Sequence, residues 1–175
     1  MKILAFAASN SLNSINKKLI TYAKTLLDKH EVEILDINDY ELPIYSIDLE
    51  EAQGIPAAAS DFLNKITEAD ALLISYAEHN GNYTVAYKNL FDWSSRKSRE
   101  VYQGKPTVML STSPGPGGAN SVLGLAKGSA HFFGGNVVAS LSVPSFYDNF
   151  DTEKGELNNP DLITELKAAL SALDG

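Results

Sequence analysis

The sequence predicts an α/β fold, with a five-stranded parallel sheet covered by helices on both faces, and three observations support this. Short apolar runs alternate along the chain with segments that have a helical period of 3.6 residues. Several of the runs lack the polar alternation of a half-exposed strand, which is typical of strands buried on both sides. The turns between runs and helices are short, and such units give right-handed crossovers. A doubly wound sheet follows.

The elements are expected in a regular order. Strands are predicted at residues 3–8, 32–37, 71–76, 107–111 and 137–143. One helical stripe follows the first strand, and a second follows the third strand; they run from Ile15 to Leu27 and from Val85 to Ser94. Asn159 is expected to cap the last helix, with Pro160 in its first turn. Residues 38–55 are predicted to be an irregular surface excursion.

Composition limits the classes of protein that the chain can belong to. Its 175 residues suit one domain spanning 1–175, and no apolar run approaches the ~20 residues that cross a bilayer. A net charge of −8 without a basic cluster argues against a nucleic-acid surface. The acidity either keeps the protein soluble or forms a docking face for a redox partner. Cytoplasm is the default location.

Several chemistries are excluded or disfavoured. The chain has no cysteine, which excludes disulfides, thiol nucleophiles and thiolate metal sites. Its three histidines, His30, His79 and His131, lack a metal-type spacing, so no metal site is expected. There is no G-x-S-x-G elbow of the kind that a hydrolase with this fold would use.

The loop after the first strand is dense in hydroxyl and amide groups. Ser9, Ser11, Ser14 and Asn16 lie where it enters the first helix, with Ile15 among them. The amino end of a helix has free N–H groups and a partial positive charge, so these residues suit a phosphate. Alternatively, Asn13 or Ser14 is simply a helix cap. Neither G-x-G-x-x-G nor G-x-x-x-x-G-K is present, which favours a monophosphate over a dinucleotide or triphosphate.

Two further loops follow the third and fourth strands. Ligands of such sheets bind at the carboxyl ends of the strands, so both loops belong to the candidate site. Residues 76–83 mix polar and aromatic groups that suit the edge of a flat heterocycle, although Asn80 and Gly81 can equally form a turn with His79 as a surface residue. Residues 111–118 contain two prolines and three glycines, which indicates an irregular backbone with bare N–H groups.

These loops resemble those of the NAD(P)H-dependent FMN reductases, which include quinone, azo and chromate reductases. The first loop is similar to the family pattern G-S-x-R-x-x-S-x-N-x-x-L through Ser9, Ser14, Asn16 and Leu19, with Ser11 in place of the arginine. Ala8 stands for the glycine. The third loop is similar to the family's S-x-x-x-x-G-G region through Ser113, Gly117 and Gly118.

The most specific part of the resemblance runs from Glu78 to Trp93. The family has P-E-Y-N followed by L-K-N-A-x-D-W, and this chain has A-E-H-N followed by Y-K-N-L-F-D-W. Ala77 and His79 therefore replace a proline and a tyrosine. A serine at position 11 also lacks the bidentate phosphate contact of an arginine.

The resemblance implies a flavodoxin-like fold with strand order 2-1-3-4-5 and bound FMN. It implies a phosphate at Ser9, Ser14 and Asn16, and a flavin ring between the second and third loops. NADPH or NADH would be the reductant, and no side chain is expected to be catalytic because FMN carries the chemistry. The expected cofactor-binding residues are Ser9, Ser11, Ser14, Ile15, Asn16, Ala77, Glu78, His79, Asn80, Gly81, Ser113, Pro114, Gly115, Gly117 and Gly118.

Partners and an alternative function follow from the same reading. The electron acceptor would be a small molecule such as a quinone, an azo compound or free flavin. We expect a homodimer or homotetramer, with Tyr83, Tyr87 and Trp93 as interface candidates, although core packing is the alternative for Trp93. A flavodoxin-type electron-transfer protein is the alternative function, against which stands the absence of a T-x-T-G-x-T loop.

Overall fold

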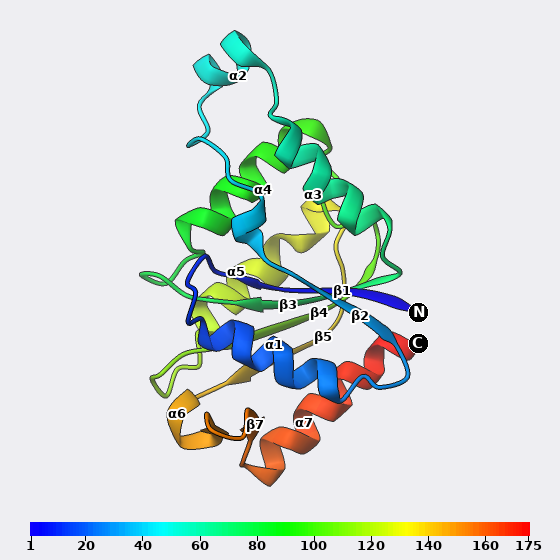
Figure 1. Ribbon diagram of the computed structural model, residues 1–175, viewed down its shortest axis with the longest axis vertical. Helices are drawn as coiled ribbons and strands as arrows, with labels where there is room; N and C mark the ends of the chain where they lie inside the picture. Colours follow the sequence, from blue (N-terminus) through cyan, green and yellow to red (C-terminus); the bar gives the residue numbers. More distant parts are fainter.

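The computed structural model describes all 175 residues and contains the five-stranded parallel sheet, in the order β2-β1-β3-β4-β5 (Figure 1). This confirms the predicted fold and strand order. Ala8 lies opposite Tyr76, and Tyr76 lies opposite Ser111, so the three central strands end at one edge of the sheet. The strands are β1 (Lys2–Ala8), β2 (Glu31–Leu35), β3 (Ala71–Tyr76), β4 (Pro106–Thr112) and β5 (Asn136–Val143).

Helices cover both faces of the sheet, and each face has its own apolar core. On one face lie α1 (Ile15–Thr25) and α7 (Pro160–Ser171). On the other face lie α3 (Ala57–Thr67), α4 (Val85–Lys97) and α5 (Asn120–Ala130) (Figure 1).

Strand β1 shows why the sequence has continuous apolar runs. Side chains of a strand point alternately to opposite faces. Leu4 and Phe6 therefore join the core under α3 to α5, whereas Ile3 and Ala5 join the core under α1 and α7. Because helices cover both faces, neither set of positions tolerates polar residues.

The segment between β2 and α3 differs from the expected irregular excursion. It contains a short 3₁₀ helix, η1 (Ile37–Asp39), and a helix, α2 (Ile47–Gln53), that stands away from the sheet (Figure 1). Ser46 caps α2 by accepting the Leu49 N–H at 3.1 Å, and Gly54 ends it with φ 77°. No residue of α2 is buried, so the helix has no apolar stripe from which it could be predicted.

Short elements complete the chain after α5. They are η2 (His131–Phe133), α6 (Phe146–Asn149), η3 (Ala172–Asp174) and an antiparallel pair, β6 (Phe150–Asp151) with β7 (Glu156–Leu157). Asn159 caps α7 and Pro160 opens it, as predicted. None of the helices combines the length and the apolar character that crossing a membrane would need.

Two of the three aromatic residues expected at an oligomer interface lie in the core. Tyr87 is 2% exposed and Trp93 is fully buried, so their side chains cannot form that interface. Tyr87 packs against Phe6 and Tyr76, with ring centroids 6.3 and 5.6 Å apart. Core packing, the alternative for Trp93, is therefore correct, and only Tyr83 is partly exposed.

Candidate functional site

A cleft of about 270 Å³ lies at the carboxyl ends of β1, β3 and β4, where the three predicted loops meet. Most of the expected cofactor-binding residues line it, and none of the lining side chains is a lysine or an arginine. Asn80, Gly81, Gly115, Gly117 and Gly118 are not part of the lining. The lining residues are Ser9, Ser11, Asn13, Ser14, Ile15, Asn16, Ala77, Glu78, His79, Thr112, Ser113, Pro114 and Tyr147.

The first loop brings free N–H groups to the cleft. Ser14, one of the two residues expected as a cap, caps α1, and its Oγ accepts the Lys17 N–H at 3.2 Å. The N–H groups of Ile15 and Asn16, in the first turn, make no hydrogen bond within the protein. The Ser11 N–H donates to Ser9 Oγ at 3.2 Å, and the Ser11 hydroxyl makes no hydrogen bond within the protein. Free donors at the positive end of a helix dipole suit an anionic group.

The side chain of Asn16, which was expected to bind the phosphate, is buried and hydrogen-bonded within the protein. Its side chain is 2% exposed, and Oδ1 accepts hydrogen bonds from Ser75 Oγ at 2.7 Å and from the Thr112 N–H at 3.1 Å. Its Nδ2 donates to the Thr112 carbonyl at 3.2 Å. The amide therefore ties α1 to the ends of β3 and β4, and Asn16 offers the cleft its backbone N–H.

No cation supports the anion-binding end of the cleft. Lys17 and Lys18, in the first turns of α1, are the two lysines that could stand in for the arginine, and Lys17 Nζ lies 2.6 Å from the carboxylate of Asp36. The hydrogen bond from Lys17 lowers the pKa of Asp36 below its ordinary value, and a backbone hydrogen bond from Asn38 acts in the same direction. Lys17 is thus already paired. The cleft would bind a phosphate through hydroxyls, N–H groups and the helix dipole.

The second loop is held by Glu78. Its Oε2 accepts the backbone N–H of Val122, in the first turn of α5, at 2.8 Å. The residue before α5, Ala119, has φ 60° and provides no side-chain cap. Glu78 therefore caps α5 from another loop, with its negative charge at the positive end of the helix.

The next residues form a tight turn, as the alternative interpretation predicted. His79 and Asn82 exchange backbone hydrogen bonds of 2.9 and 3.1 Å. Between them, Asn80 (φ 54°) and Gly81 (φ 74°) both have the left-handed backbone of a type I′ turn. Asn80 and Gly81 are exposed and do not line the cleft, whereas His79 does.

The third loop is anchored by Gly118, which is buried. Ser111 Oγ and Ser142 Oγ donate to its carbonyl oxygen at 2.7 and 2.8 Å. The residue has φ 57°, and a Cβ there would clash with Ser142 Oγ. Glycine is thus required at this position for close packing inside the loop. Ser113 and Pro114 are the parts of this loop that face the cleft.

Tyr147, Asn13 and Thr112 line the cleft but were not among the predicted residues. Tyr147 lies in α6, after β5, and is 62% exposed beside the fully buried Phe146. The Ser145 and Phe146 N–H groups donate to the Gly115 and Ser113 carbonyls at 2.9 and 3.0 Å, which fixes α6 to the third loop. The prediction considered only the loops after the first, third and fourth strands and so missed Tyr147.

Similarity to known proteins extends over most of the chain. Residues 1–149 match the family described as NADPH-dependent FMN reductase. The chain is 33% identical over 116 residues to an NAD(P)H-dependent FMN reductase of Pseudomonas aeruginosa, covering 66% of this chain and 61% of that protein. It is 30% identical over 165 residues to a 2-hydroxy-1,4-benzoquinone reductase of a Burkholderia species, covering 90% and 84%.

Among solved structures, the fold is similar to FerB, a flavoenzyme NAD(P)H:(acceptor) oxidoreductase from Paracoccus denitrificans. The TM-score is 0.76 at 24% identity, with 99% of this chain and 95% of that chain covered. Because the family match spans residues 1–149 and the sheet has the flavodoxin-like order, the chain belongs to the NADPH-dependent FMN reductase family.

Proposed function

We propose that the protein is an NAD(P)H-dependent oxidoreductase that holds FMN in this cleft and reduces a small acceptor of the quinone type. The observation that carries the assignment of the cleft is the pair of unbonded N–H groups of Ile15 and Asn16 in a cleft without a cation. A monophosphate needs one such cradle, and a second nucleotide signature is absent from the sequence. The names of the relatives support the quinone class.

The residues present fit FMN at both ends of the cleft. The phosphate would meet the Ile15 and Asn16 N–H groups and the hydroxyls of Ser11 and Ser14. Ser14 Oγ accepts a hydrogen bond from Lys17, so its own proton remains free to donate. The flavin ring would lie between Glu78 and His79 on one side and Ser113 and Pro114 on the other, with Tyr147 at the mouth.

Bound FMN supplies a ring that accepts a hydride from a nicotinamide and passes electrons on. The part of this chain is to position that ring. Asn16 and Glu78 fix the first and second loops through hydrogen bonds to neighbouring elements. Thr84 adds another hydrogen bond, from its Oγ1 to the Ala8 carbonyl at 2.9 Å. Positioning of this kind lowers the activation free energy by up to ~7–11 kcal/mol in well-oriented reactions.

We also infer a homodimer or homotetramer, and we expect the protein to act in the cytoplasm. Support for self-association comes from α2, which buries none of its residues and leaves Ile47 58% exposed. Apolar groups on a projecting helix are typical of an interface. Sedimentation at micromolar concentration tests this inference, and a monomer would refute it.

The activity is tested by loading the purified protein with FMN and adding NADPH or NADH without oxygen. We expect the flavin absorbance to bleach with at least one of the two reductants and to return when menadione is added. If neither reductant bleaches bound FMN, the enzyme assignment fails and the flavodoxin-type electron-transfer alternative takes its place.

A further inference from the structure

Tyr147 is the one tyrosine, phenylalanine or tryptophan that lines the cleft, and most of its side chain is left in water. It is 62% exposed, although a phenol ring is mainly apolar and gains by burial. Its ring meets one aromatic neighbour, Phe146, edge-on at a centroid distance of 5.4 Å. The fold therefore does not depend on burying Tyr147, and its ring is accessible from the cleft.

The backbone that carries Tyr147 is held at both ends of α6. At its start, Phe146 is fully buried. At its end, Asn149 Nδ2 donates to the Pro144 carbonyl at 2.9 Å, and Asn149 Oδ1 accepts Asn159 Nδ2 at 2.9 Å. A helix of four residues is thus fixed between the end of β5 and the cap of α7.

The chain enters α6 in a conformation that residues other than glycine rarely adopt. Ser145 has φ 45° and ψ 59°, in the left-handed region. Its N–H donates to the Gly115 carbonyl at 2.9 Å, and the Phe146 N–H donates to the Ser113 carbonyl at 3.0 Å. These bonds fix the direction of α6 at the carboxyl end of β5 (Figure 1). Tyr147 therefore extends the wall that the third loop forms.

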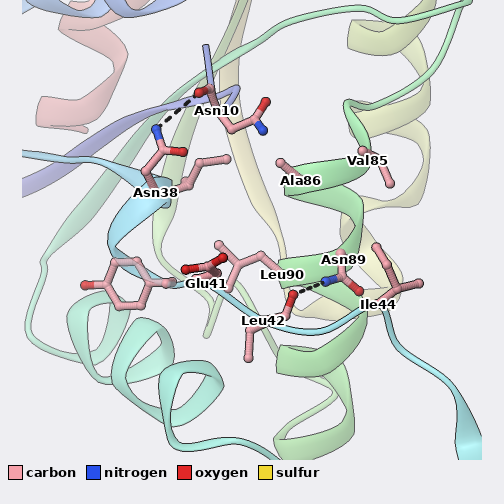
Figure 2. A pocket seen from close by; sticks show the side chains of 11 residues that line it. Asn10, Asn38, Glu41, Leu42, Ile44, Val85, Ala86, Asn89 and Leu90 are labelled. Carbon is pink, nitrogen blue, oxygen red and sulfur yellow. Dashed lines mark hydrogen bonds between the residues drawn. The ribbon is translucent and has the colours of Figure 1, made fainter. Parts of the chain in front are cut away.

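The first loop, another wall of the cleft, is held from outside the cleft. Asn38 Nδ2 donates to the Asn10 carbonyl at 3.2 Å (Figure 2). Asn10 lies between Ser9 and Ser11, which line the cleft. Tyr147 is the largest exposed side chain of the lining, so it can adjust to a bound ring by rotating about its own single bonds.

The arrangement of the lining favours the flavin ring, rather than the phosphate, as the partner of Tyr147. The hydroxyls and N–H groups that suit a phosphate come from the first loop, at the start of α1. Tyr147 is bonded through α6 to the third loop, beside which the ring would lie. Two aromatic rings attract each other in an offset stack with centroids about 4.5–7 Å apart.

We propose that Tyr147 closes over the flavin ring of bound FMN by offset stacking. The inference rests on the proposed function, because it requires FMN to occupy this cleft. The part of Tyr147 is to cover ring surface that would otherwise face water and to limit how far the ring can tilt. Its hydroxyl is not needed for this role.

Flavin fluorescence reports this contact without turnover. A phenol stacked on a flavin quenches its emission, because the excited ring takes an electron from the phenol and returns it on decay. The benzene ring of phenylalanine does not do this. Emission of bound FMN should therefore be weak in the wild type and rise severalfold in Tyr147→Phe. Tyr83→Phe makes the same change at a tyrosine that does not line the cleft, and should leave the emission unchanged.

Flavin affinity gives an independent test. Tyr147→Ala should raise the dissociation constants of FMN and riboflavin by the same factor, about tenfold, equal to ~1.4 kcal/mol, because the two flavins share the ring. Tyr147→Phe keeps the stacking surface and should change neither constant by more than about twofold. Because the side chain is exposed, both variants should be as stable as the wild type.

Three results would overturn the proposal. They are strong emission from FMN bound to the wild type, unchanged emission in Tyr147→Phe, and unchanged flavin affinity in Tyr147→Ala. A Tyr147→Phe protein that loses affinity for FMN but not for riboflavin would also overturn it, because the hydroxyl would then bind the phosphate. If the variants behave as predicted while neither NADPH nor NADH reduces bound FMN, the oxidoreductase assignment fails and the stacking role stands.

Discussion

The carboxylate of Glu78 accepts the backbone N–H of Val122 at 2.8 Å, so that a residue of the second loop caps a helix 44 positions further along the chain. The contact links two walls of the cleft. Glu78 follows β3, and α5 begins directly after the third loop. Glu78, which opens the part of the chain with the most specific family resemblance, therefore helps to set the shape of the cleft that it lines.

Replacing Glu78 should lower both the stability of the fold and the affinity for FMN. Glu78→Ala leaves the Val122 N–H without a partner, and we expect a loss of about 1–2 kcal/mol in the free energy of unfolding. FMN affinity should fall about tenfold, because the second loop is no longer fixed. Glu78→Gln keeps an oxygen acceptor and should lose less of both. Urea unfolding and flavin titration measure the two effects, and a Glu78→Ala protein with normal stability would contradict the capping role.

Substitution by alanine should lower the stability of the protein at Gly118 and leave it unchanged at the adjacent Gly117. Gly118→Ala places a Cβ against Ser142 in a left-handed backbone conformation, and we expect a loss of about 3 kcal/mol in the free energy of unfolding. Gly117→Ala meets nothing within 4 Å and serves as the matched control. The melting temperatures of the two variants, measured by thermal unfolding, give the comparison. Similar melting temperatures would show that the third loop is not packed as described.

Lys17→Ala tests whether the anion-binding end works without a cation. Because Lys17 is paired with Asp36, FMN affinity should change by less than about twofold. The Asp36 pKa lies below its ordinary 3.8, so the pair stabilises the folded protein at neutral pH, and this stabilisation is lost as the pH falls through the lowered value. Wild type and Lys17→Ala should therefore converge in stability in acid. A large loss of FMN affinity would instead place Lys17 at the phosphate.

Replacing Asn16 should mainly lower the stability of the fold, whereas replacing Ser14 should also weaken FMN binding. Asn16→Ala leaves the buried Ser75 hydroxyl and Thr112 N–H without a partner, and should cost about 2–4 kcal/mol of folding free energy. Ser14→Ala removes a cap, at about 1 kcal/mol, and should weaken FMN by about 1–2 kcal/mol. Unfolding and flavin titration of both variants provide the comparison. If Asn16→Ala folds normally and only loses FMN, its amide is a ligand after all.

The sheet could be predicted from the sequence because its central strands are buried on both faces. Residues 71–76 are apolar or small throughout, and each of them is buried. Helix α2 could not be predicted in this way, because it buries no face and its cap, Ser46, also fits a plain turn. Local signals such as Asn80-Gly81 gave the turn correctly.

The roles of individual polar residues were the part that the sequence could not predict. Asn16 and Glu78 have partners 96 and 44 positions away, and no local pattern reveals such pairings. Serine, asparagine and glutamate beside a helix terminus suit a ligand or a neighbouring loop equally well. Tyr147 was missed because it follows the last strand, outside the loops around which the prediction was built.

The central claim is that the first loop of this cleft binds the phosphate of FMN. The measurement that tests it most directly compares the affinities of the purified flavin-free protein for FMN and for riboflavin, which differ only by that phosphate. We predict that FMN binds at least about tenfold more tightly, through the Ile15 and Asn16 N–H groups and the Ser11 and Ser14 hydroxyls, and that Ser14→Ala narrows the difference. Equal affinity for the two flavins would contradict the assignment.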